Sequence, residues 1–153
     1  MNEVIKKEFT HLKIHTQYSI CEGALKTSDL AKYCKTNKIK AVGLCDTNNL
    51  CGALEFSEFI AKSKTQPIIG TQINIQHKGK SGKIPLFAKN LEGYKNLIKL
   101  SSKSFLEIKD NEEPHCKLDD IESNCKGLIL LTGSFDGLIG KLFSKNLTDE
   151  IIA

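Results

Sequence analysis

Residues 11–23, HLKIHTQYSICEG, combine side chains that could bind a metal ion with one that cannot. His11, Lys13 and His15 alternate along a strand-like run, so their side chains should point to the same side. Two imidazoles there would suit a borderline metal ion, whereas a charged lysine offers only donors and no lone pair. The segment is therefore either a working metal site or the remnant of one.

Further polar side chains follow the other expected strands. Chemistry in a parallel α/β fold collects at the C-terminal ends of the strands, and this rule adds Glu22, Asp46, Gln72 and Ser134 as candidates. Each has a plainer explanation. The histidines could be hydrogen-bonded strand ends, Asp46 could cap a helix, and Glu22 could be a solvated loop acid. Gln72 and Ser134 are neutral and would be weak partners for a divalent ion.

Strand and helix signals alternate along the chain. Apolar runs predict strands at 9–15, 40–46, 67–76, 84–90 and 126–134. The Gly-rich turn at 77–83 predicts that 84–90 pairs back on 67–76 as a hairpin partner. Helical spacing and caps predict helices at 26–37, 48–64, 91–105, 117–124 and 136–146. This order is typical of an α/β protein with a mostly parallel sheet or barrel. So few strands cannot close a barrel, and the sequence ends at TDEIIA, within the alternation of helix and strand signals. We therefore expect an incomplete domain.

Composition describes an ordinary globular chain and excludes several classes. The 153 residues, 40% hydrophobic and 26% charged, suit one domain. No window approaches the roughly 18 apolar residues of a membrane span, and no secretion signal is visible, so we expect a cytoplasmic protein without membrane partners. The net charge is +4, but the cations are dispersed lysines without arginine, which does not predict DNA binding. The six cysteines form no Cys-x-x-Cys pair, and we expect them to be reduced and mostly buried.

Neither a nucleophile elbow nor a P-loop is present. The serine of GSFDG (133–137) lies too early for Gly-x-Ser-x-Gly, and GKSGK (79–83) is too short for a phosphate-binding loop. Spacing alone therefore predicts no catalytic residue.

Several blocks of the chain together resemble a known family. They occur in order as HLKIHTQYSICEGAL, AVGLCDTNNLCGALEF, PIIGTQINI, LFAKNLEGYKNLIKLSS and GLILLTGS. Over nearly all of residues 8–145 the series resembles the N-terminal polymerase-and-histidinol-phosphatase (PHP) domain of bacterial replicative DNA polymerase III alpha subunits. The resemblance implies a distorted (β/α)₇ barrel. Residues 1–153 would supply roughly the first half to two-thirds of this single, incomplete domain, at the N-terminus of a much longer polymerase subunit.

The resemblance also implies where the family's metal ligands should fall. The His-x-His motif falls on Lys13 and His15, and its acid falls on Glu22. The Thr-Asp-His motif falls on Cys45, Asp46 and Thr47. A glutamate is replaced by Gln72, and a late cysteine or histidine by Ser134. Lysine, threonine, glutamine and serine thus replace ligands, so we expect a degenerate site without metal or cofactor. We further expect Lys13 to occupy the vacated cation position and to pair with Asp46 or Glu22.

The leading expectation is a catalytically inactive segment of a DNA-directed DNA polymerase, a nucleotidyltransferase of DNA replication. Its role would be to support the polymerase and dock the proofreading exonuclease subunit. Its partners would be that exonuclease, the rest of the subunit and the replisome, with DNA and Mg²⁺ bound mainly by absent domains.

Two alternatives stay open. One is a PHP phosphoesterase or 3′–5′ exonuclease with zinc or manganese held by His11, His15, Glu22 and Asp46. The other is a free-standing DNA-binding module, which the dispersed lysines disfavour. Whether the chain is natural or shortened, its oligomeric state, its docking surface and any weak metal binding are also open.

Overall fold

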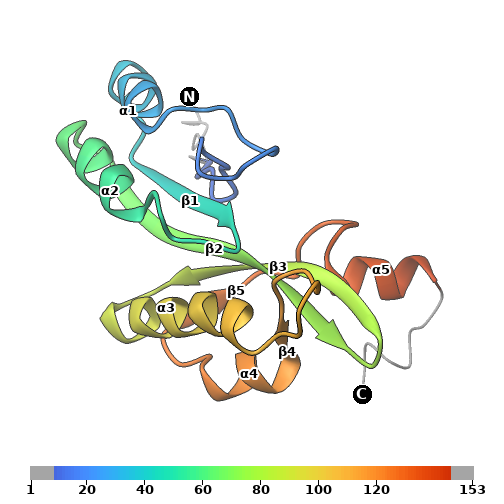
Figure 1. The fold of residues 1–153 in the computed structure, drawn as a ribbon. Coiled ribbons are helices and arrows are strands. Elements are labelled where there is room, and N and C mark those ends of the chain that lie inside the picture. The colour runs from blue at the N-terminus through green and yellow to red at the C-terminus, as the bar shows by residue number, and fades with distance from the viewer. Residues whose placement is uncertain (1–8, 146–153) are drawn as a thin grey trace, which may run out of the picture.

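The computed structural model describes residues 9–145, which form five helices and five strands around one open, mixed sheet (Figure 1). The helices are α1 (Thr27–Thr36), α2 (Ala53–Lys62), α3 (Leu91–Leu106), α4 (Leu118–Ser123) and α5 (Leu138–Ser144). The strands are β1 (Ala41–Thr47), β2 (Gln66–His77), β3 (Lys80–Ala88), β4 (Cys116–Lys117) and β5 (Leu128–Leu130). No helix in this described part of the chain is long and apolar enough to cross a membrane.

The sheet is organised around the long strand β2. Its first half pairs in parallel with β1, and its second half pairs in parallel with the short β4. On its other side β2 pairs antiparallel with β3, which pairs antiparallel with β5. The prediction of a mostly parallel sheet is therefore wrong. The reason is the tight turn at Lys78 and Gly79, both with positive φ, which folds β3 straight back onto β2.

The expected first strand, 9–15, is reduced to irregular backbone along the free edge of β1. The amide nitrogens of Gly43 and Cys45 donate to the carbonyls of His11 and Ile14, each at 2.8 Å, but only an isolated bridge forms. His11 and Lys13 are exposed, so the segment buries too little surface to extend the sheet. The backbones are close, because a Cβ on Gly43 would lie 2.5 Å from the Leu12 carbonyl oxygen.

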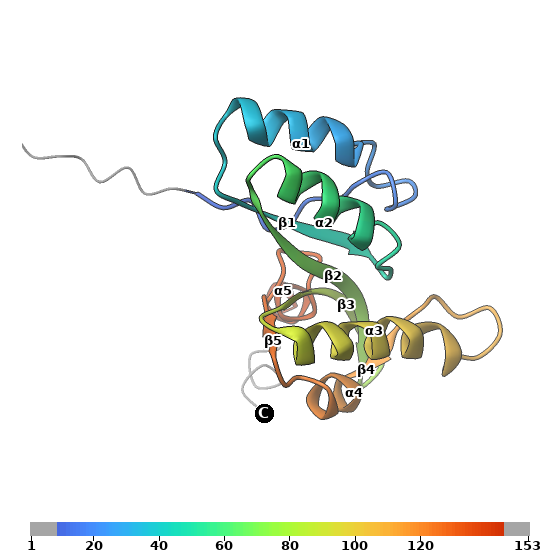
Figure 2. The same cartoon turned by 90° about the vertical axis from the view of Figure 1, so that its left-hand side faces the viewer.

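Two apolar clusters pack on the sheet, and Figure 2 shows α1 and α2 at one end of the molecule and α3 and α4 at the other. Helices α1 and α2 pack on β1, with Cys34, Leu44, Phe56 and Ile60 fully buried. Helices α3, α4 and α5 pack on β2 and β3, around Ile73, Leu86, Leu97 and Leu100. The N-terminal segment and the β2–β3 hairpin are thereby held on one framework.

Local signals located most helices and strands but missed several boundaries. The helix predicted at 48–64 begins only at Ala53, with Gly52 as its N-cap, because residues 48–51 form a loop that starts at positive φ. Asp46 therefore caps no helix and lies within β1. Leu54, in the second position of α2, is 72% exposed. The strand predicted at 126–134 shrinks to Leu128–Leu130, and Asn146, the last residue of the final predicted helix, lies outside the described residues.

Candidate functional site

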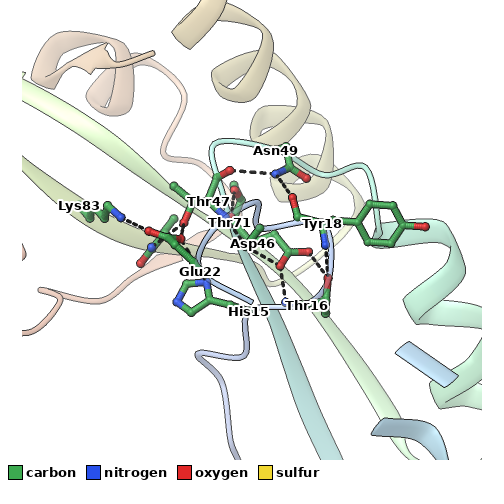
Figure 3. Close-up of polar contacts among 11 residues, drawn as sticks. His15, Thr16, Tyr18, Glu22, Asp46, Thr47, Asn49, Thr71 and Lys83 are labelled. Carbon is green, nitrogen blue, oxygen red and sulfur yellow. Dashed lines mark hydrogen bonds and ion pairs between the residues drawn. The ribbon is translucent and has the colours of Figure 1, made fainter. Parts of the chain in front are cut away.

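Asp46 is buried at the end of β1, where three hydrogen bonds occupy its carboxylate (Figure 3). Oδ1 accepts from the Thr16 amide at 2.6 Å and from the Ser19 hydroxyl at 2.7 Å. Oδ2 accepts from the Thr16 hydroxyl at 2.7 Å. All three donors belong to residues 16–22, which we call the 16–22 loop. Asp46 thus fastens this loop to the sheet with neutral donors.

Glu22, at the end of the same loop, joins three strands. One carboxylate oxygen accepts a hydrogen bond from Lys83 on β3, and the other accepts one from the Thr47 hydroxyl at the end of β1. The Thr47 hydroxyl in turn accepts from the side-chain amide of Gln72 on β2, at 2.7 Å. His15 Nδ1 lies 3.9 Å from Glu22 Oε2. A continuous chain of polar contacts therefore runs from β3 through the loop to β1 and β2.

Two buried atoms at this cluster lack a hydrogen-bond partner among the described residues, His15 Nδ1 and Gln72 Oε1. The amide orientation of Gln72 follows from its neighbours. The Thr47 hydroxyl has one proton, which goes to Glu22, so it can only accept from Gln72. That arrangement leaves Gln72 Oε1 as an acceptor without a donor, although the residue is only 2% exposed.

Burial and hydrogen bonding set the charges of the cluster. Burial lowers the pKa of His15, an effect that the Glu22 carboxylate only partly opposes, so the imidazole is mainly neutral at pH 7. Partial burial acts to raise the pKa of Glu22, but hydrogen bonds from Lys83 and Thr47 outweigh it and hold that pKa below its usual value. The ionised carboxylate therefore faces one ammonium group and a neutral imidazole.

Of the seven predicted relic positions, the structure brings five together and leaves two apart, and His11, the further ligand of the alternative metal site, is exposed with its ring against Phe9. His15, Glu22, Asp46, Thr47 and Gln72 gather at the ends of β1 and β2. Lys13 is exposed and forms no ion pair within residues 9–145, so its predicted pairing with Asp46 or Glu22 is wrong. Ser134 is exposed and lines a separate apolar hollow with Phe135, Ile139 and Phe143.

Lys83 is the residue that sequence reasoning missed. It was assigned to the Gly-rich turn 77–83, whereas the turn itself is short and β3 begins at Lys80. In the hairpin, Lys83 pairs with Asn74, two residues from Gln72 on the same strand. Side chains alternate along strands, so this register places Lys83 on the face of Gln72. A two-residue hairpin turn, if assumed, would have revealed the contact.

The residues present do not fit a divalent metal centre. Within residues 9–145 no group of three or more His, Cys, Asp or Glu side chains is placed to hold a metal ion. The Asp46 oxygens are occupied, and Glu22 already faces an ammonium group. His15 Nδ1 and Gln72 Oε1 would offer a metal only two neutral ligands.

Comparison with known proteins places this arrangement in a family. The PHP domain profile matches residues 11–152, and the chain belongs to the PHP domain family. It is 35% identical to the DNA polymerase III subunit alpha of Caulobacter vibrioides over 100% of its own length, and 38% identical to that of Rickettsia prowazekii over 97%. The subunit of Haemophilus influenzae is 33% identical over 94% of the chain. The match falls in the N-terminal region of these subunits, and the chain spans only 12–14% of their length.

A solved structure is also similar. It is described as a putative metal-dependent phosphoesterase from Bifidobacterium adolescentis, is 17% identical, and aligns with a TM-score of 0.44 over 76% of this chain and 42% of its own.

Proposed function

We propose that the chain is the N-terminal PHP segment of a DNA polymerase III alpha subunit, in which it is a non-catalytic scaffold. Identity of 33–38% to such subunits along nearly the whole chain supports this assignment. DNA-directed DNA polymerase activity, with its Mg²⁺, would then belong to the complete subunit in the cytoplasm. The open sheet would be the first half to two-thirds of a distorted (β/α)₇ barrel that further chain completes.

The observation that carries the non-catalytic role is the engagement of both carboxylates. Both Asp46 carboxylate oxygens accept hydrogen bonds from the 16–22 loop, and Glu22 is held by Lys83 and Thr47. A metal-dependent phosphoesterase needs such carboxylates free to bind its ions. Here the two carboxylates connect the strands to the 16–22 loop, as expected of side chains that stabilise a rigid scaffold.

Metal content tests the scaffold. Purified chain, analysed by mass spectrometry, should contain substoichiometric zinc and manganese and melt at the same temperature before and after chelation. It should also show no nucleotide incorporation on primed template. Near-stoichiometric metal with a chelator-sensitive melt would contradict the proposal.

Docking of the proofreading exonuclease subunit is the second part of the proposal. Fluorescently labelled chain should bind the exonuclease subunit of the same organism in anisotropy titrations, and an unrelated nuclease of similar charge is the control. Equal anisotropy changes with both proteins would contradict the docking role, while the proposed scaffold role would be unaffected.

The alternative is a metal-dependent PHP phosphoesterase or 3′–5′ exonuclease with zinc or manganese. The unpartnered His15 Nδ1 and Gln72 Oε1 favour it, because both atoms lie in the cluster that contains Glu22. Chelator-sensitive hydrolysis of single-stranded DNA or of a phosphate ester, lost in His15→Ala, would establish this reading over the scaffold.

A further inference from the structure

The Lys83–Glu22 contact is a half-buried ion pair between segments distant in sequence. Lys83 lies on β3, 61 residues after Glu22 in the 16–22 loop. The two side chains are 33% and 31% exposed. Exposed pairs such as Lys126 with Glu92, at 80% and 49%, are weakened by solvent screening. The Lys83 pair is better shielded and continues through Thr47 to Gln72.

The chemistry around the ammonium group matches what a cation site offers. Glu22 supplies negative charge, Gln72 Oε1 is an acceptor without a donor, and His15 Nδ1 has no hydrogen-bond partner among the described residues of the same cluster. A lysine ammonium carries three donors, of which the Glu22 contact uses one. A cation is therefore the kind of group that this cluster accepts, and Lys83 is a cation covalently attached to the sheet.

The same ammonium group disfavours a metal ion. A divalent ion close enough to bind Glu22 would lie within a few ångströms of the Lys83 charge, where like charges repel strongly in a partly buried setting. It would have to displace Lys83 from its carboxylate. The remaining ligands, one imidazole and one amide oxygen, are too few and neutral to offset that cost.

We infer that the Lys83 ammonium group is the resident cation of this site: it takes the position from which a divalent ion would contact Glu22 and makes the fold independent of metal. The inference deepens the proposed non-catalytic role and rests on it. It also assigns to Lys83 the place that sequence reasoning gave to Lys13.

Thermal melting of three forms of the full chain tests the inference. Lys83→Met removes the charge and keeps an unbranched apolar stem, and Lys13→Met removes a nearby exposed charge as the matched control. We expect Mn²⁺ or Zn²⁺ at about ten times its Kd to raise the Tm of Lys83→Met by roughly 3–6 °C. Wild type and Lys13→Met should not respond. Equal responses of wild type and Lys83→Met, whether both rise or neither does, would overturn the inference.

A measurement on the unmodified protein covers the case in which Lys83→Met does not fold. Brief acetylation followed by peptide mass spectrometry reports the reactivity of each lysine amine. Lys83 should react several-fold more slowly than exposed Lys13, and millimolar Mn²⁺ should leave that ratio unchanged. Acceleration at Lys83 on adding Mn²⁺ would show that the metal displaces the ammonium group and would refute the inference.

The inference and the proposed function can fail separately. Nuclease activity in wild type without metal-induced change at Lys83 would remove the non-catalytic role and leave the Lys83–Glu22 ion pair in place without its role as a substitute for metal. An inactive wild type in which metal exposes Lys83 would remove only the resident-cation inference.

Discussion

Thr16 donates two hydrogen bonds to Asp46, from its amide at 2.6 Å and from its hydroxyl at 2.7 Å. The two residues are 30 positions apart, and Asp46 is fully buried. This double contact holds the 16–22 loop against the end of β1 and so places Glu22 within reach of Thr47 and Lys83. Asp46 is therefore the anchor of the loop.

Removal of the anchor should destabilise the fold. Asp46→Ala leaves the Thr16 amide and the Ser19 hydroxyl without acceptors, and each buried unpaired donor costs about 1–3 kcal/mol. We expect the free energy of unfolding, from urea titration, to fall by about 2–5 kcal/mol. Asp110→Ala, at an exposed position, is the control and should change it by less than about 0.5 kcal/mol. A similar small loss in both variants would contradict the anchoring role.

An acid at position 72 should be unfavourable at neutral pH. Gln72→Glu buries a second carboxylate near Glu22 and removes the amide that donates to Thr47. Burial and the like charge should raise the pKa of the new acid, so its cost grows as pH rises through that pKa. We expect a loss of about 2–4 kcal/mol at pH 8 and a smaller loss at pH 5. Gln76→Glu, exposed on the same strand, should show no such pH dependence.

His15 should make stability depend on pH below neutrality. Burial lowers its pKa in the folded chain, so the unfolded chain binds the proton more readily. The contribution of His15 to stability is therefore fully present above about pH 6.5, the pKa of the unfolded chain. It is lost as the pH falls toward the lower pKa of the folded chain. Tm measured from pH 7.5 to 5 should fall less in His15→Gln than in wild type, while exposed His11→Gln should follow wild type. Parallel curves for all three proteins would count against this role.

The six cysteines should separate into two reactivity classes. All are free; Cys34, Cys45 and Cys116 are buried, but Cys21, Cys51 and Cys125 are exposed, so the prediction that most are buried is wrong. Burial raises the pKa of Cys45 and of Cys116 to about 12. Only the thiolate reacts with iodoacetamide. A pKa of about 12 in place of 9.0 lowers the thiolate fraction roughly a thousandfold. Iodoacetamide at pH 8 should label the exposed three within minutes and Cys45 and Cys116 only in urea, as peptide mass spectrometry can show.

Elements with strong local signals were predicted closely. Helix 91–105 corresponds to α3 (Leu91–Leu106) and strand 67–76 to β2 (Gln66–His77), because apolar periodicity and end signals lie within each segment. The two-residue β4 and the late start of α2 had no such signal. They depend on contacts with β2 and on the loop after β1, which belong to the assembled fold.

The expectation of a degenerate metal site comes from the sequence itself, since lysine, threonine and glutamine at 13, 47 and 72 are present whatever the fold. Only the tertiary structure decided which lysine forms an ion pair with Glu22. Lys13 is nine residues away in sequence yet exposed, whereas Lys83 is 61 away and in contact. Ion pairing depends on distance in space, and that distance was set by the register of the β2–β3 hairpin and by the hydrogen bonds that hold the 16–22 loop on Asp46.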